Sequence, residues 1–118
     1  MSLISIGFFK ELPYGEETGG SLNECRSKFS GEHMEEILSY LKAGVLFVVS
    51  PGLSRDYFSP SHEIIGSLSL LTDGVFIWPS DLAFYVEKYR VDVPLSFYLH
   101  MKKNDWKIAP VDISRLEM

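Results

Sequence analysis

The sequence has a single cysteine, Cys25, and no long apolar run. One cysteine excludes an intramolecular disulfide, so we expect a protein of the reducing cytoplasm. The longest apolar run, Val45 to Val49, has strand length and falls far short of the ~20 residues that a membrane-spanning helix needs. The first residues, Met1 to Ile4, lack the basic region and the cleavage site of a signal peptide. We therefore expect neither secretion nor a membrane partner.

Basic residues are also scarce, since 11 Lys and Arg stand against 16 Asp and Glu and give a formal net charge of −5. An anionic protein repels the phosphate backbone, so we expect no nucleic-acid partner. The acids concentrate between Glu11 and Glu36, in a stretch that is either a solvated surface or a steering patch for a basic partner. The candidate partner-binding acids are Glu11, Glu16, Glu17, Glu24, Glu32, Glu35 and Glu36.

The sequence also lacks a complete pattern for catalysis or metal binding. No G-x-S-x-G elbow and no cysteine-protease signature accompanies Cys25, and the three histidines form no H-E-x-x-H pattern. The glycines of the loop Pro13–Asn23 have no G-K-[ST] ending, and the acids around them would repel phosphate. We expect no enzyme, no catalytic residue, no metal and no cofactor.

What the chain does have is a periodic apolar pattern over 118 residues, with 14% aromatics to fill a core. This length suits one domain over residues 1–118. The pattern predicts strands at Ser2–Phe9, Val45–Val49, Ser67–Leu71 and Val75–Trp78, helices at Ser30–Lys42, Ser80–Tyr89 and Pro94–Lys103, and a last edge strand at Trp106–Val111. This order predicts an α+β fold, with a mainly antiparallel sheet of four or five strands and about three helices packed on one face.

Local signals predict where these elements begin and end. Ser30 and Ser80 are predicted helix N-caps, and Gly44 is a predicted left-handed helix end. Val45–Val49 is expected to be a buried strand that Pro51-Gly52 breaks, and Asp73-Gly74 predicts the tight turn of a hairpin. Pro94 is expected to open the third helix, in which Leu95, Tyr98, Leu99 and the stem of Lys102 lie along one side.

A second candidate surface is the group Arg55, Asp56 and Tyr57, within a predicted loop over Leu53–Ile65. Polar and aromatic side chains on a braced loop suit recognition, but they are also common in ordinary surface turns. Trp78 follows an apolar run, and we favour a core ring over the alternative of a partly exposed contact residue.

The run from Leu71 to Val86, with Thr72-Asp73-Gly74 followed by Trp78-Pro79-Ser80-Asp81-Leu82, resembles a pattern that recurs in small bacterial proteins. The segments Ile6–Gly15 and Tyr89–Phe97 also fit this pattern. Some proteins of this kind look like immunity proteins of toxin systems, including contact-dependent growth inhibition. The resemblance implies a protein that binds a cognate toxin and blocks it, and it transfers no catalytic residue.

Three functions remain open on the sequence. The leading expectation is a non-enzymatic immunity protein that neutralises a toxin, and a basic nuclease would suit the acidic sequence. The alternative is a small-molecule or regulatory binding module with a pocket near Tyr57 and Trp78. The third is a small hydrolase built on Asp56, His62 and Glu63. The sequence does not give the oligomeric state.

Overall fold

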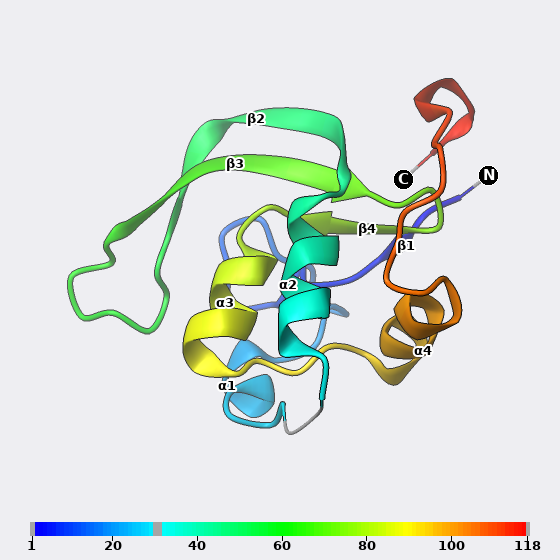
Figure 1. Cartoon of the computed structure of the whole chain (residues 1–118). Helices are drawn as coiled ribbons and strands as arrows, with labels where there is room; N and C mark the ends of the chain where they lie inside the picture. Colours follow the sequence, from blue (N-terminus) through cyan, green and yellow to red (C-terminus); the bar gives the residue numbers. More distant parts are fainter. Residues whose placement is uncertain (1, 30–31, 118) are drawn as a thin grey trace.

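A computed structural model of the chain describes residues 2–29 and 32–117. Its strands form one four-stranded mixed sheet in the order β1-β4-β3-β2 (Figure 1). The strands are β1 (Ile4–Ser5), β2 (Val45–Arg55), β3 (Ile64–Thr72) and β4 (Phe76–Pro79). The helices are α1 (Leu22–Cys25), α2 (Met34–Lys42), α3 (Leu82–Tyr89), α4 (Leu95–Lys103) and the short 3-10 helix η1 (Ile113–Arg115). Among these strands β1 and β4 pair in parallel and the other two neighbouring pairs are antiparallel, so the predicted α+β class and mainly antiparallel sheet are confirmed.

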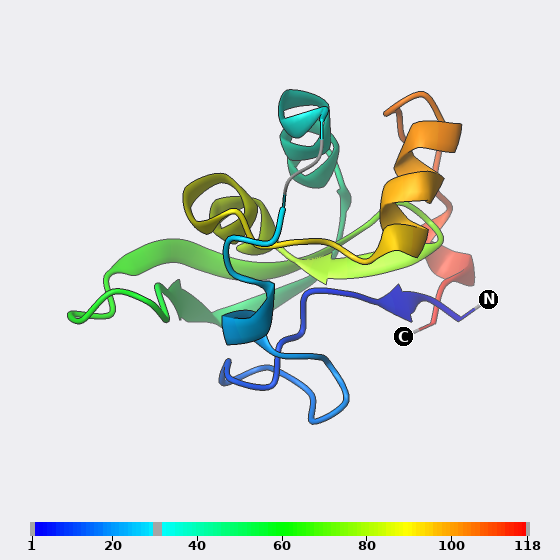
Figure 2. The ribbon, with the colours of Figure 1, turned by 90° about the horizontal axis from the view of Figure 1, so that it is seen from below.

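Three helices, α2, α3 and α4, form a layer on one face of the sheet (Figure 2). Figure 2 shows α2, α3 and α4 together on that face, while α1 and the loop before it lie on the opposite side. A sheet with one helical layer buries apolar side chains between the two, which is the arrangement expected of an α+β fold. No helix in the described ranges is long and apolar enough to cross a membrane.

Trp78 of β4 lies at the centre of the core under the helices and is fully buried. Its indole Nε1 donates a hydrogen bond of 3.1 Å to the Leu41 carbonyl of α2, and its ring packs 5.4 Å from the ring of Phe97 in α4. A buried indole N–H needs such a partner. The interpretation of Trp78 as a core ring is therefore confirmed.

The turn between β3 and β4 forms at Asp73-Gly74, as predicted. One carboxylate oxygen of Asp73 accepts hydrogen bonds from the Val75 and Phe76 amides at 2.9 and 2.7 Å, and Gly74 adopts φ +97°. The other oxygen accepts a 2.5 Å hydrogen bond from the Tyr40 hydroxyl and lies 3.2 Å from His100 Nε2. The same side chain therefore shapes the turn and attaches α2 and α4 to it.

The predicted boundaries of three strands are wrong, since β3 begins at Ile64, within the predicted loop, and not at Ser67. The first strand covers only Ile4–Ser5, because Gly7 adopts φ +79° and turns the chain away from β4 soon after β1 ends. The second does not stop at Pro51-Gly52 but runs to Arg55, with register shifts against β3. β2 is an edge strand, and an edge strand tolerates a proline and bulges because only one of its sides pairs with a neighbouring strand.

The predicted cap at Ser80 is also wrong. Its hydroxyl is engaged by β3, accepting a hydrogen bond from the Ser69 amide at 3.0 Å and donating one to the Ser67 carbonyl at 3.3 Å. Asp81 occupies the N-cap position of α3 without a side-chain cap. The predicted cap Ser30 lies outside the described residues.

Gly44 does not adopt the predicted left-handed conformation, and α2 ends at Ala43 in the right-handed region. A Cβ at position 44 would lie 2.7 Å from Cζ2 of Trp78 and 2.8 Å from Cβ of Leu71. The glycine is therefore required by the close approach of the backbone to the core.

The side of the third helix that carries Leu95 and Leu99 is not the side that faces the core, although Tyr98 packs against the core at its edge. Leu95 and Leu99 are 70% and 51% exposed, whereas Phe97 and Met101 are fully buried against the core. Both pairs have helical spacing, so the spacing alone did not decide which side faces the sheet. The predicted strand at Trp106–Val111 is absent from the described residues, because the chain leaves α4 through positive φ angles at Asp105 and Trp106.

Candidate functional site

A pocket of about 440 Å³ lies between β2, the β2–β3 turn and the N-terminal loop. We call it the β2 pocket. It is lined by Glu11, Leu12, Pro13, Tyr14, Gly52, Leu53, Arg55, Tyr57, His62 and Leu68. The lining is mostly apolar, with a few charged groups among the wall residues. A concave site of this composition and size is typical of ligand pockets, which measure roughly 300–1,000 Å³.

Glu11 contributes to the pocket but is not a free acid. Its carboxylate accepts four hydrogen bonds, from the Ser21 hydroxyl, the Leu22 amide, and both the amide and the side chain of Asn23, at 2.7–3.0 Å. Burial raises the pKa of Glu11, but these hydrogen bonds outweigh burial and lower the pKa to about 2. Glu11 therefore anchors the start of α1, and its charge is already compensated.

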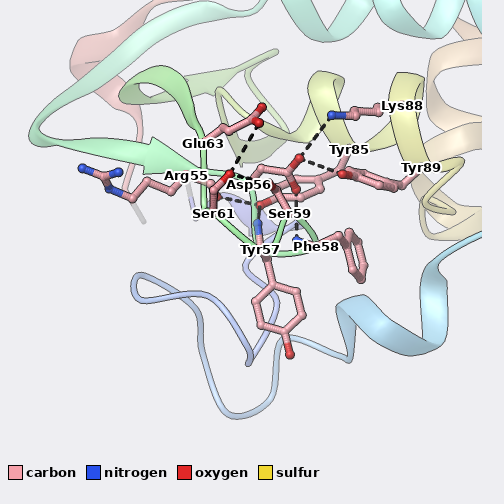
Figure 3. A network of polar contacts seen from close by, with 10 residues as sticks. All are labelled: Arg55, Asp56, Tyr57, Phe58, Ser59, Ser61, Glu63, Tyr85, Lys88 and Tyr89. Carbon is pink, nitrogen blue, oxygen red and sulfur yellow. Dashed lines mark hydrogen bonds and ion pairs between the residues drawn. The ribbon is translucent and has the colours of Figure 1, made fainter.

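Asp56 was predicted to contact a partner, but its side chain is fully buried and cannot do so in this structure. Figure 3 shows its carboxylate directed toward α3, where it accepts hydrogen bonds from the Tyr89 hydroxyl at 2.7 Å and from Lys88 at 3.4 Å. It also accepts one from the Phe58 amide at 3.0 Å. Burial raises the pKa of Asp56, but the hydrogen bonds outweigh burial and lower the pKa overall. Asp56 attaches the turn to α3.

In Figure 3 the side chains of Arg55 and Tyr57 extend away from that of Asp56, in two different directions, and both residues line the β2 pocket. The Arg55 guanidinium donates a 3.3 Å hydrogen bond to the His62 carbonyl and pairs with no carboxylate of residues 2–29 or 32–117. The Tyr57 hydroxyl accepts a 3.2 Å hydrogen bond from Asn23, which also donates to Glu11. Three of the predicted site residues, Glu11, Arg55 and Tyr57, therefore surround one pocket.

The other predicted acids are exposed but do not form one surface with the pocket. Glu16 and Glu17 lie in the loop before α1, and Glu24 lies on α1. Glu35 and Glu36 lie on α2, with Glu32 just before that helix. Figure 2 places α2 and the loop before α1 on opposite sides of the sheet, so the acidic stretch is divided between two faces.

Behind the pocket wall lies a buried polar cluster that the sequence did not reveal. The hydroxyls of Tyr14 and Ser54 both donate to Oδ2 of Asp81, at the start of α3. Oδ1 of Asp81 has no hydrogen-bond partner, and burial raises the pKa of this carboxyl group. The cluster fixes Tyr14, a wall residue of the β2 pocket, against β2 and α3.

A second feature is a set of exposed apolar side chains on both faces of β2 and at the start of β3, one of which, Leu53, also lines the pocket. We call it the β2–β3 apolar surface, and its side chains are 38% to 65% exposed: Leu46, Val48, Val49, Leu53 and Ile64. β2 is an edge strand, and it carries no charged residue between Val45 and Ser54. The expectation of a buried strand at Val45–Val49 is therefore wrong. No strand of residues 2–29 or 32–117 pairs with the outer edge of β2.

The arrangement offers groups for binding, and the proposed hydrolase residues do not converge. The Asp56 carboxylate turns toward α3, while the Glu63 carboxylate accepts a hydrogen bond from Ser61 within the turn. Within the described ranges no three His, Cys, Asp or Glu residues are grouped to hold a metal ion. Burial raises the pKa of Cys25, which reduces its thiolate fraction.

No protein-family model, no curated protein and no solved structure matches this chain.

Proposed function

We propose that this protein is a non-enzymatic immunity protein of the bacterial cytoplasm, which binds a cognate toxin and neutralises it. The observation that carries the proposal is the β2–β3 apolar surface, on an edge strand without a charged residue over Val45–Ser54. Edge strands of monomeric proteins are usually protected by charged side chains, because exposed apolar edges associate with other chains. A set of exposed apolar side chains on such an edge favours a function in which a partner covers them.

A toxin bound at this surface would gain stability from two sources. Full burial of a Val or Leu side chain contributes about 1.5–3 kcal/mol, so completing the burial of half-exposed Leu46, Val49 and Leu53 contributes several kcal/mol in total. The outer backbone groups of β2 before Pro51 can also pair with an extended segment of the partner. The interface therefore resembles an added strand with side-chain contacts on both sides.

The acidic residues contribute differently. The net charge of −5 and the exposed acids on both faces of the sheet attract a basic partner at long range, which raises its association rate. The apolar surface supplies contacts that set the lifetime of the complex. A basic toxin domain, such as a nuclease, fits both features.

The test is co-expression with the polypeptide encoded beside this gene. We expect that polypeptide to stop growth alone, growth to be restored by the wild-type protein, and the two purified chains to form a stoichiometric complex in calorimetry. Absence of both protection and complex formation contradicts the proposal. An intact enzymatic activity of the polypeptide at saturating protein would show binding without neutralisation, and would also contradict it.

The second candidate function is a small-molecule or regulatory binding module, and the β2 pocket is the observation that favours it. Tyr57 lines this pocket as expected, but Trp78 does not, because its ring is fully buried in the core.

A further inference from the structure

We propose that the β2 pocket binds an apolar group that carries a carboxylate, such as an arylalkanoic acid or an apolar carboxyl-terminal residue of a polypeptide. The inference concerns the pocket alone and goes beyond toxin binding, so it holds or fails independently of the proposed function.

The apolar part of this ligand follows from the walls of the pocket. Leu12, Pro13, Leu53 and Leu68 line it together with the rings of Tyr14 and Tyr57. Side chains of this kind gain free energy by covering an aliphatic or aromatic group, and aromatic walls favour a flat ring. A volume of about 440 Å³ accommodates a ring with a short chain.

The carboxylate of the ligand is inferred from the two charged residues, Glu11 and Arg55, that line the pocket. The one acid that lines it, Glu11, already accepts four hydrogen bonds. The arginine that lines it, Arg55, is exposed and uses a single hydrogen bond, to the His62 carbonyl. A guanidinium presents five N–H donors and binds carboxylates in a bidentate manner. A bound carboxylate would therefore accept hydrogen bonds from the Arg55 N–H groups that do not bond to the His62 carbonyl.

The pocket is also held in shape without a ligand. Tyr14 is fixed by its hydrogen bond to buried Asp81, and the Tyr57 amide donates a 3.0 Å hydrogen bond to the Tyr85 hydroxyl. Asn23 bridges Glu11 and the Tyr57 hydroxyl. Walls fixed in advance lose little conformational entropy on binding, which favours a specific ligand over a nonspecific apolar contact.

The experiment is a titration of ¹⁵N-labelled protein followed by NMR with four probes: 3-phenylpropionate, 3-phenylpropionamide, acetyl-Ala-Ala-Phe with a free carboxyl terminus, and the same peptide amidated. We expect shifts at residues of the β2 pocket with a Kd on the order of 1 mM for at least one acid. Each amide should bind roughly fivefold more weakly than its acid. Tighter binding of the peptide acid would indicate a polypeptide terminus, and tighter binding of phenylpropionate would indicate a free small acid.

Two sets of variants, at Arg55 and at Leu53, test whether charge at the β2 pocket decides the preference for a carboxylate. Arg55→Gln should remove the difference between acid and amide, whereas Lys103→Gln at the exposed end of α4 should preserve it. Leu53→Glu should weaken both acids severalfold relative to Leu53→Gln, which has the same polarity without the charge. The exposure of Leu53 makes both changes compatible with folding. Equal binding of acids and amides to the wild type, or an acid preference that survives Arg55→Gln, overturns the inference, whether or not a toxin binds.

Discussion

The hydroxyl of Tyr89 in α3 donates a hydrogen bond of 2.7 Å to the carboxylate of Asp56, at the beginning of the β2–β3 turn. Tyr85, one helical turn earlier, donates its hydroxyl to the Arg55 carbonyl at 3.0 Å. Two tyrosines of one helix therefore hold the turn that presents Arg55 and Tyr57. The candidate site depends on a rigid helix rather than on the loop alone.

Replacement of Asp56 by Ala should destabilise the protein. It leaves the half-buried Phe58 amide and Tyr89 hydroxyl without their acceptor, at a cost of about 1–3 kcal/mol in the free energy of unfolding. Urea denaturation measures this cost. The control Glu63→Ala, at an exposed position of the same turn, should change it by less than about 0.5 kcal/mol. A similar loss in both variants would contradict the role assigned to Asp56.

The stability that the protonated Asp81 side chain contributes should decrease as the pH rises. Because burial raises the pKa of Asp81 above its ordinary value of 3.8, the folded state binds its proton more tightly than the unfolded state. The stability that this proton provides is present below pH 3.8 and is lost as the pH rises through the raised pKa. The free energy of unfolding of the wild type minus that of Asp81→Asn should therefore fall from pH 4 upward, as measured by urea denaturation across that range. A pH-independent difference would argue against a raised pKa.

Gly44→Ala should destabilise the core. The new methyl group would lie under 3 Å from Trp78 and Leu71, and overpacking of this kind costs about 1–3 kcal/mol. Gly66 in β3 is the matched control, because a methyl group there meets no atom within 4 Å. Thermal unfolding should show a lower Tm for Gly44→Ala and an unchanged or higher Tm for Gly66→Ala. Equal Tm values would mean that Gly44 is not confined by the core.

The parts of the fold that were predictable from the sequence are those where a local signal and the tertiary structure agree. Asp73-Gly74 favours a tight turn in any context, and the turn is used in the same way here, with the Asp73 carboxylate accepting the next amides. The apolar run before Pro79 similarly predicted a strand with a core indole at Trp78.

The other parts depend on contacts that are distant in the sequence. The continuation of β2 past Pro51 depends on its place at the sheet edge, and the side that α4 buries depends on where Phe76 and Trp78 lie. The β2 pocket forms because Glu11–Tyr14 meets the turn after β2, and no local pattern encodes that meeting. Charge counting also could not separate Glu11, which is engaged at α1, from exposed Glu16.

The central claim is that the β2–β3 apolar surface binds the toxin, and a comparison of two exposed apolar positions tests it most directly. Val49 on β2 and Leu99 on α4 are 65% and 51% exposed, so a change to Glu is tolerated by the fold at both. The measurement is the Kd for the purified toxin by calorimetry. The account predicts that Val49→Glu raises the Kd by about tenfold or more, while Leu99→Glu leaves it unchanged. A wild-type Kd for Val49→Glu would contradict it.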